Sequence, residues 1–149
     1  MSPIDGWCRT QTMAKLKLEL EPDPAVTVIG ISSHVNDYRL CWSINRTIGL
    51  SMARRRTDIE EGANGVMARY SAYDHTDPTT QERFTLINNH SGDGILLKEH
   101  RQTDYFLVVD NELAERHPDL LNALRTADFV LTAYTIPYEQ LRMGHKLLL

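Results

Sequence analysis

Cysteine is scarce in this sequence, which contains only Cys8 and Cys41 in 149 residues. Two cysteines are too few for a disulfide scaffold, and no Cys-X-X-Cys motif is present. Long apolar runs are also lacking, since none approaches the ~20 residues that a membrane-spanning helix needs. Residues 1–12 have neither a basic start nor an apolar stretch, so they do not have the pattern of a signal peptide. We therefore expect a cytoplasmic protein that does not use a membrane.

A basic excess is absent as well. The chain has 16 lysines and arginines against 20 aspartates and glutamates, which gives a formal net charge of −4. Nucleic-acid-binding domains usually carry an excess of positive charge, so this balance argues against that class. Hydrophobic residues make up 42% and charged residues 24% of the chain, as in ordinary globular domains. The length fits one domain with one sizeable core.

Three segments in the first part of the chain have the patterns of strands. Residues 15–20 alternate apolar and polar, with leucines on one face, which predicts a half-buried strand. Residues 26–31 form a continuous apolar run, which favours a strand that is buried on both faces. Residues 50–56 are expected to form a short returning strand.

A helix is predicted between the last two of these strands. Over Asn36–Ile48 the apolar residues recur at helical spacing, and Arg39, Ser43 and Arg46 fall on the opposite face. Ser32 and Ser33 precede this segment as capping residues. Gly49 stands where a helix C-cap belongs.

The middle of the chain has the pattern of an antiparallel meander. Residues 66–73 and 83–88 are rich in β-prone side chains, and the polar segment 74–78 joins them. Residues 91–94, Ser-Gly-Asp-Gly, predict a turn, because glycine tolerates the backbone angles that tight turns need.

The last third alternates strand and helix patterns. Residues 105–109 and 129–136 are apolar, and Pro137 ends the second run. Pro118 is suited to the first position of a helix that ends near Thr126. Strand, helix and strand of these lengths favour a right-handed crossover between parallel neighbours. The whole pattern predicts a single α+β domain, with a mixed, mostly antiparallel sheet of about six or seven strands packed against two α-helices.

A family resemblance is carried by residues 96–107. Leu97-Lys98-Glu99 is followed, three residues later, by Thr103-Asp104-Tyr105. This spacing resembles the signature of the IPExxxVDY family, an uncharacterised group of small bacterial proteins, with Glu99, Asp104 and Tyr105 as the matching residues. Lys98 replaces the family proline and does not restrain the backbone as proline would. The resemblance runs from about residue 13 to about residue 141. It divides the chain into a disordered extension (1–12), one domain (13–141) and a C-terminal tail (142–149).

Two groups of residues are candidates for contact with a partner. Tyr38, Trp42 and Asn45 fall on one flank of the predicted helix, and aromatic side chains with a polar tip are favoured at interfaces and pocket rims. The alternative is that they complete the packing against the sheet.

The signature residues Glu99, Asp104 and Tyr105 form the second group. Three roles are open to them: holding their own loop, contacting a partner, or acting as acid and base in a reaction. Catalysis requires that the three side chains converge in one pocket.

A local basic cluster, Arg54, Arg55 and Arg56, is a candidate for binding phosphate or RNA. Successive side chains of a strand point to opposite faces, however, so the three cannot form one compact fork. The alternative is an edge strand that its charges protect against aggregation.

The sequence gives weak support for a metal site and for a catalytic cysteine. Asp74, His75 and Asp77, with His90 further along, are metal-ligating residue types, but their segment has the composition of a solvated turn. Cys41 falls on the apolar face of the predicted helix, where a cysteine behaves as a small hydrophobe. We expect no metal and no cofactor.

These observations favour a non-catalytic adaptor or regulator that binds another protein. The alternatives are a small-ligand or RNA-binding module that uses the three arginines, and an enzyme that uses Glu99, Asp104 and Tyr105.

Overall fold

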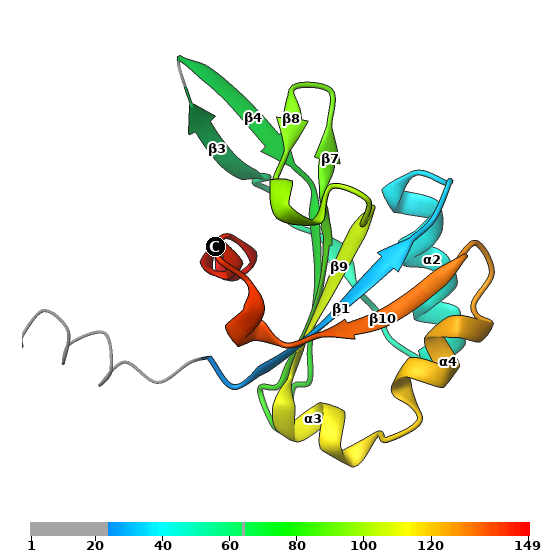
Figure 1. Cartoon of the computed structure of the whole chain (residues 1–149). Helices are drawn as coiled ribbons and strands as arrows, with labels where there is room; N and C mark the ends of the chain where they lie inside the picture. Colours follow the sequence, from blue (N-terminus) through cyan, green and yellow to red (C-terminus); the bar gives the residue numbers. More distant parts are fainter. Residues whose placement is uncertain (1–23, 64) are drawn as a thin grey trace, which may run out of the picture.

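The computed structural model describes residues 24–63 and 65–149, so the predicted strand 15–20 and the predicted extension 1–12 lie outside the described residues. Its central element is a six-stranded sheet in the order β10-β1-β9-β6-β5-β2, in which every pair of neighbours is antiparallel (Figure 1). The strands are β1 (Val26–Ser32), β2 (Ala53–Arg54), β5 (Ala72–Thr76), β6 (Arg83–Asn88), β9 (Tyr105–Asp110) and β10 (Thr132–Ile136). The predicted α+β class is confirmed.

Three helices cover one face of this sheet. They are α2 (Asp37–Ile48), α3 (Asn111–Arg116) and α4 (Leu120–Thr126). Leu40 and Ile44 of α2 and Leu124 of α4 are fully buried against strand residues such as Leu86 and Leu107. These side chains form the first of two apolar clusters.

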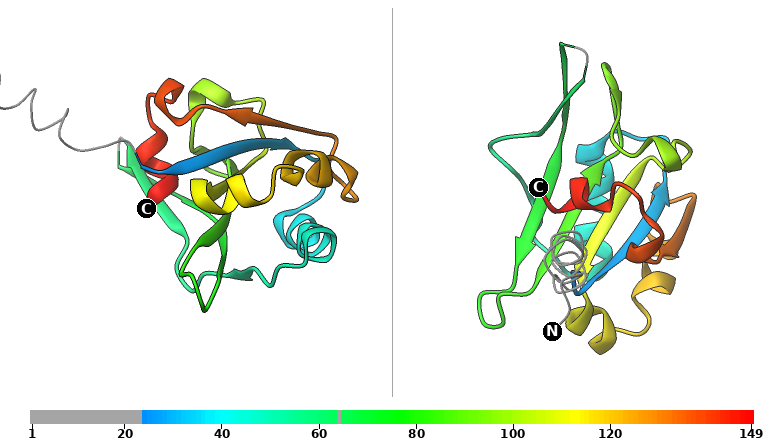
Figure 2. Two further views of the ribbon diagram at one scale, coloured as in Figure 1. Left: turned by 90° about the horizontal axis from the view of Figure 1, so that it is seen from below. Right: turned by 60° about the vertical axis from the view of Figure 1, so that its left-hand side comes forward.

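The opposite face is covered by irregular segments and hairpins (Figure 2). They are the hairpin of β3 (Ile59–Ala63) and β4 (Val66–Tyr70), the short pair β7 (His90–Ser91) and β8 (Gly94–Ile95), and the 3-10 helices η1 (Lys98–His100), η2 (Tyr138–Gln140) and η3 (Gly144–Leu148). Residues 142–149, predicted to be a tail, include η3, and Leu147 is buried in the second apolar cluster.

Strand β9 lies inside the sheet and is buried on both faces. Tyr105, Leu107 and Val109 belong to the helix-side cluster, whereas Phe106 and Val108 belong to the cluster on the other face. The continuous apolar run predicted such a strand, because both of its faces must be covered.

Helix α2 follows its sequence pattern, except at its start and at Ser43. Ser43 was predicted to point away from the core, but it is buried, and its hydroxyl donates a 2.7 Å hydrogen bond to the carbonyl of residue 128. The N-cap of the helix is Asn36, whose side chain accepts a hydrogen bond from the amide of Arg39, rather than Ser32 or Ser33. Gly49 ends the helix in the left-handed conformation with a φ of 80°, as predicted.

The predicted crossover between parallel neighbours is wrong. Strands β9 and β10 do run in the same direction, but both pair with β1, which lies between them. The backbone hydrogen bonds that β9 and β10 form on their facing edges go to β1, which runs antiparallel to both. The connection through α3 and α4 therefore crosses β1 instead of joining two adjacent strands.

Several element boundaries also differ from the predictions. The predicted strand 66–73 is broken at Ser71, because β4 pairs with β3 while β5 pairs with β6. Strand β5 continues to Thr76, into the segment predicted to be a loop. Helix α4 begins at Leu120 rather than Pro118, and α3 was not predicted. Strand β10 begins at Thr132 rather than at Phe129, whose φ of 73° lies outside the β region.

Candidate functional site

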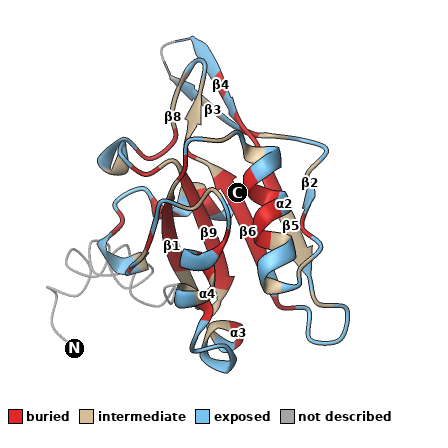
Figure 3. Cartoon of the chain, turned by 90° about the vertical axis from the view of Figure 1, so that its right-hand side faces the viewer, coloured by how far each residue is buried: buried red, intermediate tan, exposed pale blue. Residues whose placement is uncertain are grey.

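A groove of about 340 Å³ lies between the exposed flank of α2 and the edge strand β2. Figure 3 shows β2 as an exposed strand beside this helix. Tyr38 and Trp42, one helical turn apart, stand on the rim with 69% and 49% of their surface exposed. Most large aromatic side chains of a domain are better buried than this, so the pair marks the groove as a candidate interaction surface.

The floor of the groove is held in place by Asn45. Its Oδ1 accepts a hydrogen bond of 2.9 Å from the Met52 amide, and its Nδ2 donates one of 3.1 Å to the Met52 carbonyl. This double contact joins α2 to the residue just before β2, and thereby sets the width of the groove. Asn45 is therefore a positioning residue.

Trp42 is supported from its own helix. The guanidinium carbon of Arg46 lies 5.3 Å from the centroid of the Trp42 ring. A cation over the face of an indole is attracted by the ring and restricts its rotamers. The exposed indole is therefore partly ordered before any contact with a partner.

The carboxylate of Asp37 gives one end of the groove a negative charge. Its Oδ2 accepts a hydrogen bond from the hydroxyl of Ser71. Burial raises the pKa of the Cys41 thiol to about 11, and the Asp37 charge adds to the shift. Burial likewise raises the pKa of Tyr73 to about 12, with Asp37 again contributing. Both groups therefore stay neutral near pH 7, and the charged side chains that line the groove are Asp37 and Arg54.

Glu99 lies apart from Asp104 and Tyr105, which both form hydrogen bonds to the segment 33–35. Glu99 accepts hydrogen bonds from the amides of Arg142 (3.2 Å) and Met143 (3.1 Å), in the C-terminal segment. Asp104 accepts a hydrogen bond from the amide of Ser33, just after β1. The buried Tyr105 donates one of 2.7 Å to a carbonyl in the segment before α2, that of residue 35. The convergence that catalysis by these residues requires is not present.

The three arginines do not converge on one phosphate-binding site either. Arg54 pairs with Asp58 at 3.1 Å, and Arg55 forms a two-point ion pair with Asp74. Arg56 is exposed. Local carboxylates therefore neutralise two of the three charges that the RNA-binding hypothesis uses.

The residues considered as metal ligands are also dispersed. Burial acts to raise the pKa of Asp74, but hydrogen bonds from Arg55 and Thr85 outweigh it, so the pKa lies below its usual value. His75, the next residue of β5, points to the opposite face, and its Nδ1 accepts a hydrogen bond from the amide of residue 51. Nε2 of His90 lies 3.8 Å from Oδ1 of Asp104. Over residues 24–63 and 65–149, no three histidine, cysteine or acidic side chains are grouped to hold a metal ion.

Several groove residues, among them Asp37, Met52 and Tyr73, were not predicted as site residues from the sequence. Met52 precedes β2, and Tyr73 of β5 is paired with Arg54 of β2. Strand alternation does place Tyr73 and His75 on one face, but which face meets α2 depends on pairing between distant segments.

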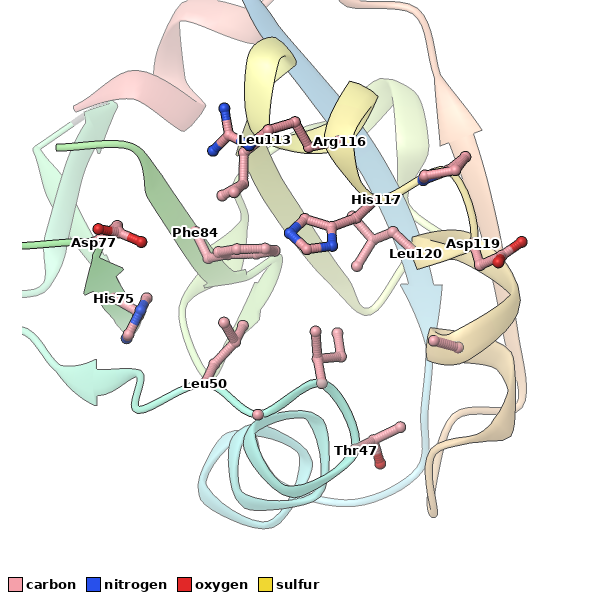
Figure 4. Close-up of a pocket in the computed structure, with 14 residues that line it drawn as sticks. Thr47, Leu50, His75, Asp77, Phe84, Leu113, Arg116, His117, Asp119 and Leu120 are labelled. Carbon is pink, nitrogen blue, oxygen red and sulfur yellow. The ribbon is translucent and has the colours of Figure 1, made fainter. Parts of the chain in front are cut away.

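A second depression, also missed, lies on the helical side of the sheet (Figure 4). It has a volume of about 550 Å³ and is bordered by the end of α2 and the connection between α3 and α4. His75 and His117 both line it, although 42 residues separate them in the chain.

We compared the chain with protein-family models, with curated proteins and with solved structures, and none of these comparisons gives a match. The resemblance to the IPExxxVDY family stays a prediction. None of the helices in the described ranges is both long and apolar enough to cross a membrane.

Proposed function

We propose that the protein is a cytoplasmic adaptor or regulator that binds an extended segment of a partner protein in the groove between α2 and β2. The observation that carries the proposal is the exposure of Tyr38 and Trp42 beside an edge strand. Aromatic side chains of this kind supply much of the binding energy at protein interfaces.

The edge strand explains why the partner segment is extended. Strand β2 pairs with β5 on one side, and on its other side no described strand is paired with it. An extended peptide can add to such an edge through main-chain hydrogen bonds, while alternate side chains enter pockets beside it. Here the pocket is the groove, so an apolar partner side chain is expected between Tyr38 and Trp42.

Charge adds a second feature to the expected partner. Arg54 is paired with Asp58, whereas no lysine or arginine of the described chain forms an ion pair with Asp37. A basic side chain in the partner segment would complement the Asp37 carboxylate. The expected ligand is therefore an extended peptide with an apolar anchor and a basic residue.

The test is affinity capture of the tagged protein from its native host, with brief cross-linking and mass spectrometry, in parallel with and without nuclease. The wild-type chain is compared with a Tyr38→Ala/Trp42→Ala variant. We expect the variant to capture no more than about one tenth of the principal partner that the wild type captures. Truncating interface hot spots weakens binding by about tenfold or more.

Leu131→Ala is the matched control, because Leu131 is 56% exposed and lies outside the groove. It should capture the partner as the wild type does. The proposal fails if the groove variant captures the same partner in the same amount. It also fails if nuclease removes the partner, a result that would favour RNA binding and make Arg54–Arg56 the next residues to replace.

A further inference from the structure

The cavity at the end of α2 has the size and lining of a small-molecule site. Its volume of about 550 Å³ lies within the range of ligand pockets, roughly 300–1,000 Å³. Its apolar lining comes from three parts of the fold: the end of α2, strand β6 and the helices α3 and α4. These side chains are Ile48, Leu50, Phe84, Leu113 and Leu120.

The lining favours a flat apolar body. Phe84 is buried at the back of the cavity, and the His75 ring meets it edge to face, with centroids 6.5 Å apart. Figure 4 shows the His117 ring on the other side of Phe84, directed into the cavity. Aromatic rings on a pocket wall pair well with a planar ligand, in stacked or edge-on contact.

Two imidazoles and the hydroxyl of Thr47 are polar groups in the cavity lining, and both imidazoles supply N–H donors on the Phe84 side. Nδ1 of His75 accepts a hydrogen bond from the amide of residue 51, so its neutral ring carries the proton on Nε2. Nothing in the described part of the chain forms a hydrogen bond with the His117 ring, and an imidazole always has at least one N–H to donate.

The charged groups around the cavity are already engaged or turned away. Arg116 is paired in a two-point contact with Glu82. The carboxylate of Asp77 accepts hydrogen bonds from the amides of residues 79 and 80. The carboxylate of Asp119 points away from the His117 ring in Figure 4. Beside Phe84 a ligand therefore meets imidazole donors, whereas Asp119 borders the cavity with its carboxylate directed away from His117.

We propose that this cavity binds a small organic acid with a flat apolar body. The body lies against Phe84 and Leu113, and the carboxylate accepts a hydrogen bond from the ring N–H of His117. Nε2–H of His75 is the second donor. This site is separate from the groove between α2 and β2, so the proposal does not depend on the adaptor function.

The test is an NMR titration of the full chain with 2-naphthoate, and with 2-naphthamide as the neutral control of the same shape. We expect saturable shifts with naphthoate, and an affinity about tenfold higher than for the amide, because hydrogen bonds to charged groups are the stronger kind. Nuclear Overhauser effects from the naphthalene protons should reach the side chains of Phe84 and Leu113.

Variants test the role of the imidazole. His117→Ala should weaken naphthoate binding about tenfold and leave naphthamide binding unchanged. His34→Ala, at an exposed histidine outside the cavity, should change neither. The amide spectrum of each variant reports whether it is folded. Equal binding of acid and amide, unchanged affinity in His117→Ala, contacts outside the cavity, or no saturable binding up to the solubility limit would each overturn the proposal.

Discussion

The backbone amide of Ser33 donates a 2.9 Å hydrogen bond to Oδ2 of Asp104, 71 residues further along the chain. Ser33 directly follows β1 and Asp104 directly precedes β9, and these two strands are neighbours. The Asp104 amide also donates a 3.0 Å hydrogen bond to the carbonyl of Ile31. Asp104 therefore links two central strands at one end of the sheet.

Replacing Asp104 should lower the stability of the sheet. We expect Asp104→Ala to reduce the free energy of unfolding by about 1–2 kcal/mol, because the Ser33 amide loses a charged acceptor at a site that is only partly exposed. Asp104→Asn keeps a neutral acceptor oxygen and should cost less. Urea denaturation followed by circular dichroism measures both values, and equal losses for the two variants would contradict this account.

Gly30 and Tyr134 form a second close relationship, in the pairing of β1 with β10. A Cβ atom on Gly30 would lie 2.8 Å from Cζ of Tyr134, closer than real atoms approach. The Tyr134 hydroxyl is hydrogen-bonded to that of the buried Thr103, so the ring cannot move away without losing this contact. We expect Gly30→Ala to lower the free energy of unfolding by about 1–3 kcal/mol, the usual cost of overpacking.

A double-mutant cycle identifies the cause. In a Tyr134→Ala background the added methyl group has space, so Gly30→Ala should cost much less there than in the wild type. The two losses should therefore not be additive in thermal or urea unfolding. Additive losses would mean that Gly30 is needed for another reason.

Much of the fold can be predicted from local patterns, and the exceptions have a physical cause. The apolar run of β1 indicates a buried strand, and the helical spacing around Leu40 and Ile44 indicates a helix with one buried face. Both patterns are local, so both elements were predicted. The position of β10 beside β1 was not, because strand pairing depends on contacts between distant residues. Helix α3 has only Leu113 as a buried residue, which is too little for a periodic signal.

The candidate groove was predicted only in part, for the same reason. Tyr38 and Trp42 are four residues apart on a predicted helix, so the sequence places them side by side. Met52 reaches the groove through the turn after α2, and Tyr73 reaches it through the pairing of β2 with β5. Neither contact can be predicted from a local sequence pattern. The cavity with His75 and His117 depends entirely on tertiary structure.

Trp42 and Ile44 should respond very differently to truncation, although they lie two residues apart on α2. Ile44 is fully buried, so Ile44→Ala should lower the free energy of unfolding by about 2–5 kcal/mol. Trp42 is half exposed, and Trp42→Ala should cost about 1 kcal/mol or less, the usual range for surface positions. Urea denaturation of both variants checks this. Unfolding of Trp42→Ala would place the indole in the core and remove the basis for the proposed groove.

Cys41 should be nearly inert toward thiol reagents in the folded protein. Its thiol is buried, and its pKa of about 11 leaves about one thiol in a thousand ionised at pH 8, whereas an ordinary cysteine is roughly a quarter ionised there. In a Cys8→Ser variant, so that only Cys41 reports, we expect reaction with Ellman's reagent at pH 8 to be slower by a factor of about one hundred or more than in denaturant, because thiolate is the reacting form.

Removing the charge of Asp37 should change the pKa of Cys41 in a known direction. Asp37 contributes to the raised pKa of Cys41, so Asp37→Asn should lower that pKa and increase the fraction of thiolate at a given pH. The reaction at pH 8 should then be faster than in the parent Cys8→Ser chain, yet still far slower than in denaturant, because burial is the larger cause of the shift. A thiol that reacts at the ordinary rate in the folded chain would mean that α2 separates readily from the segment around Met52, and the groove that these two elements form would not be a preformed site.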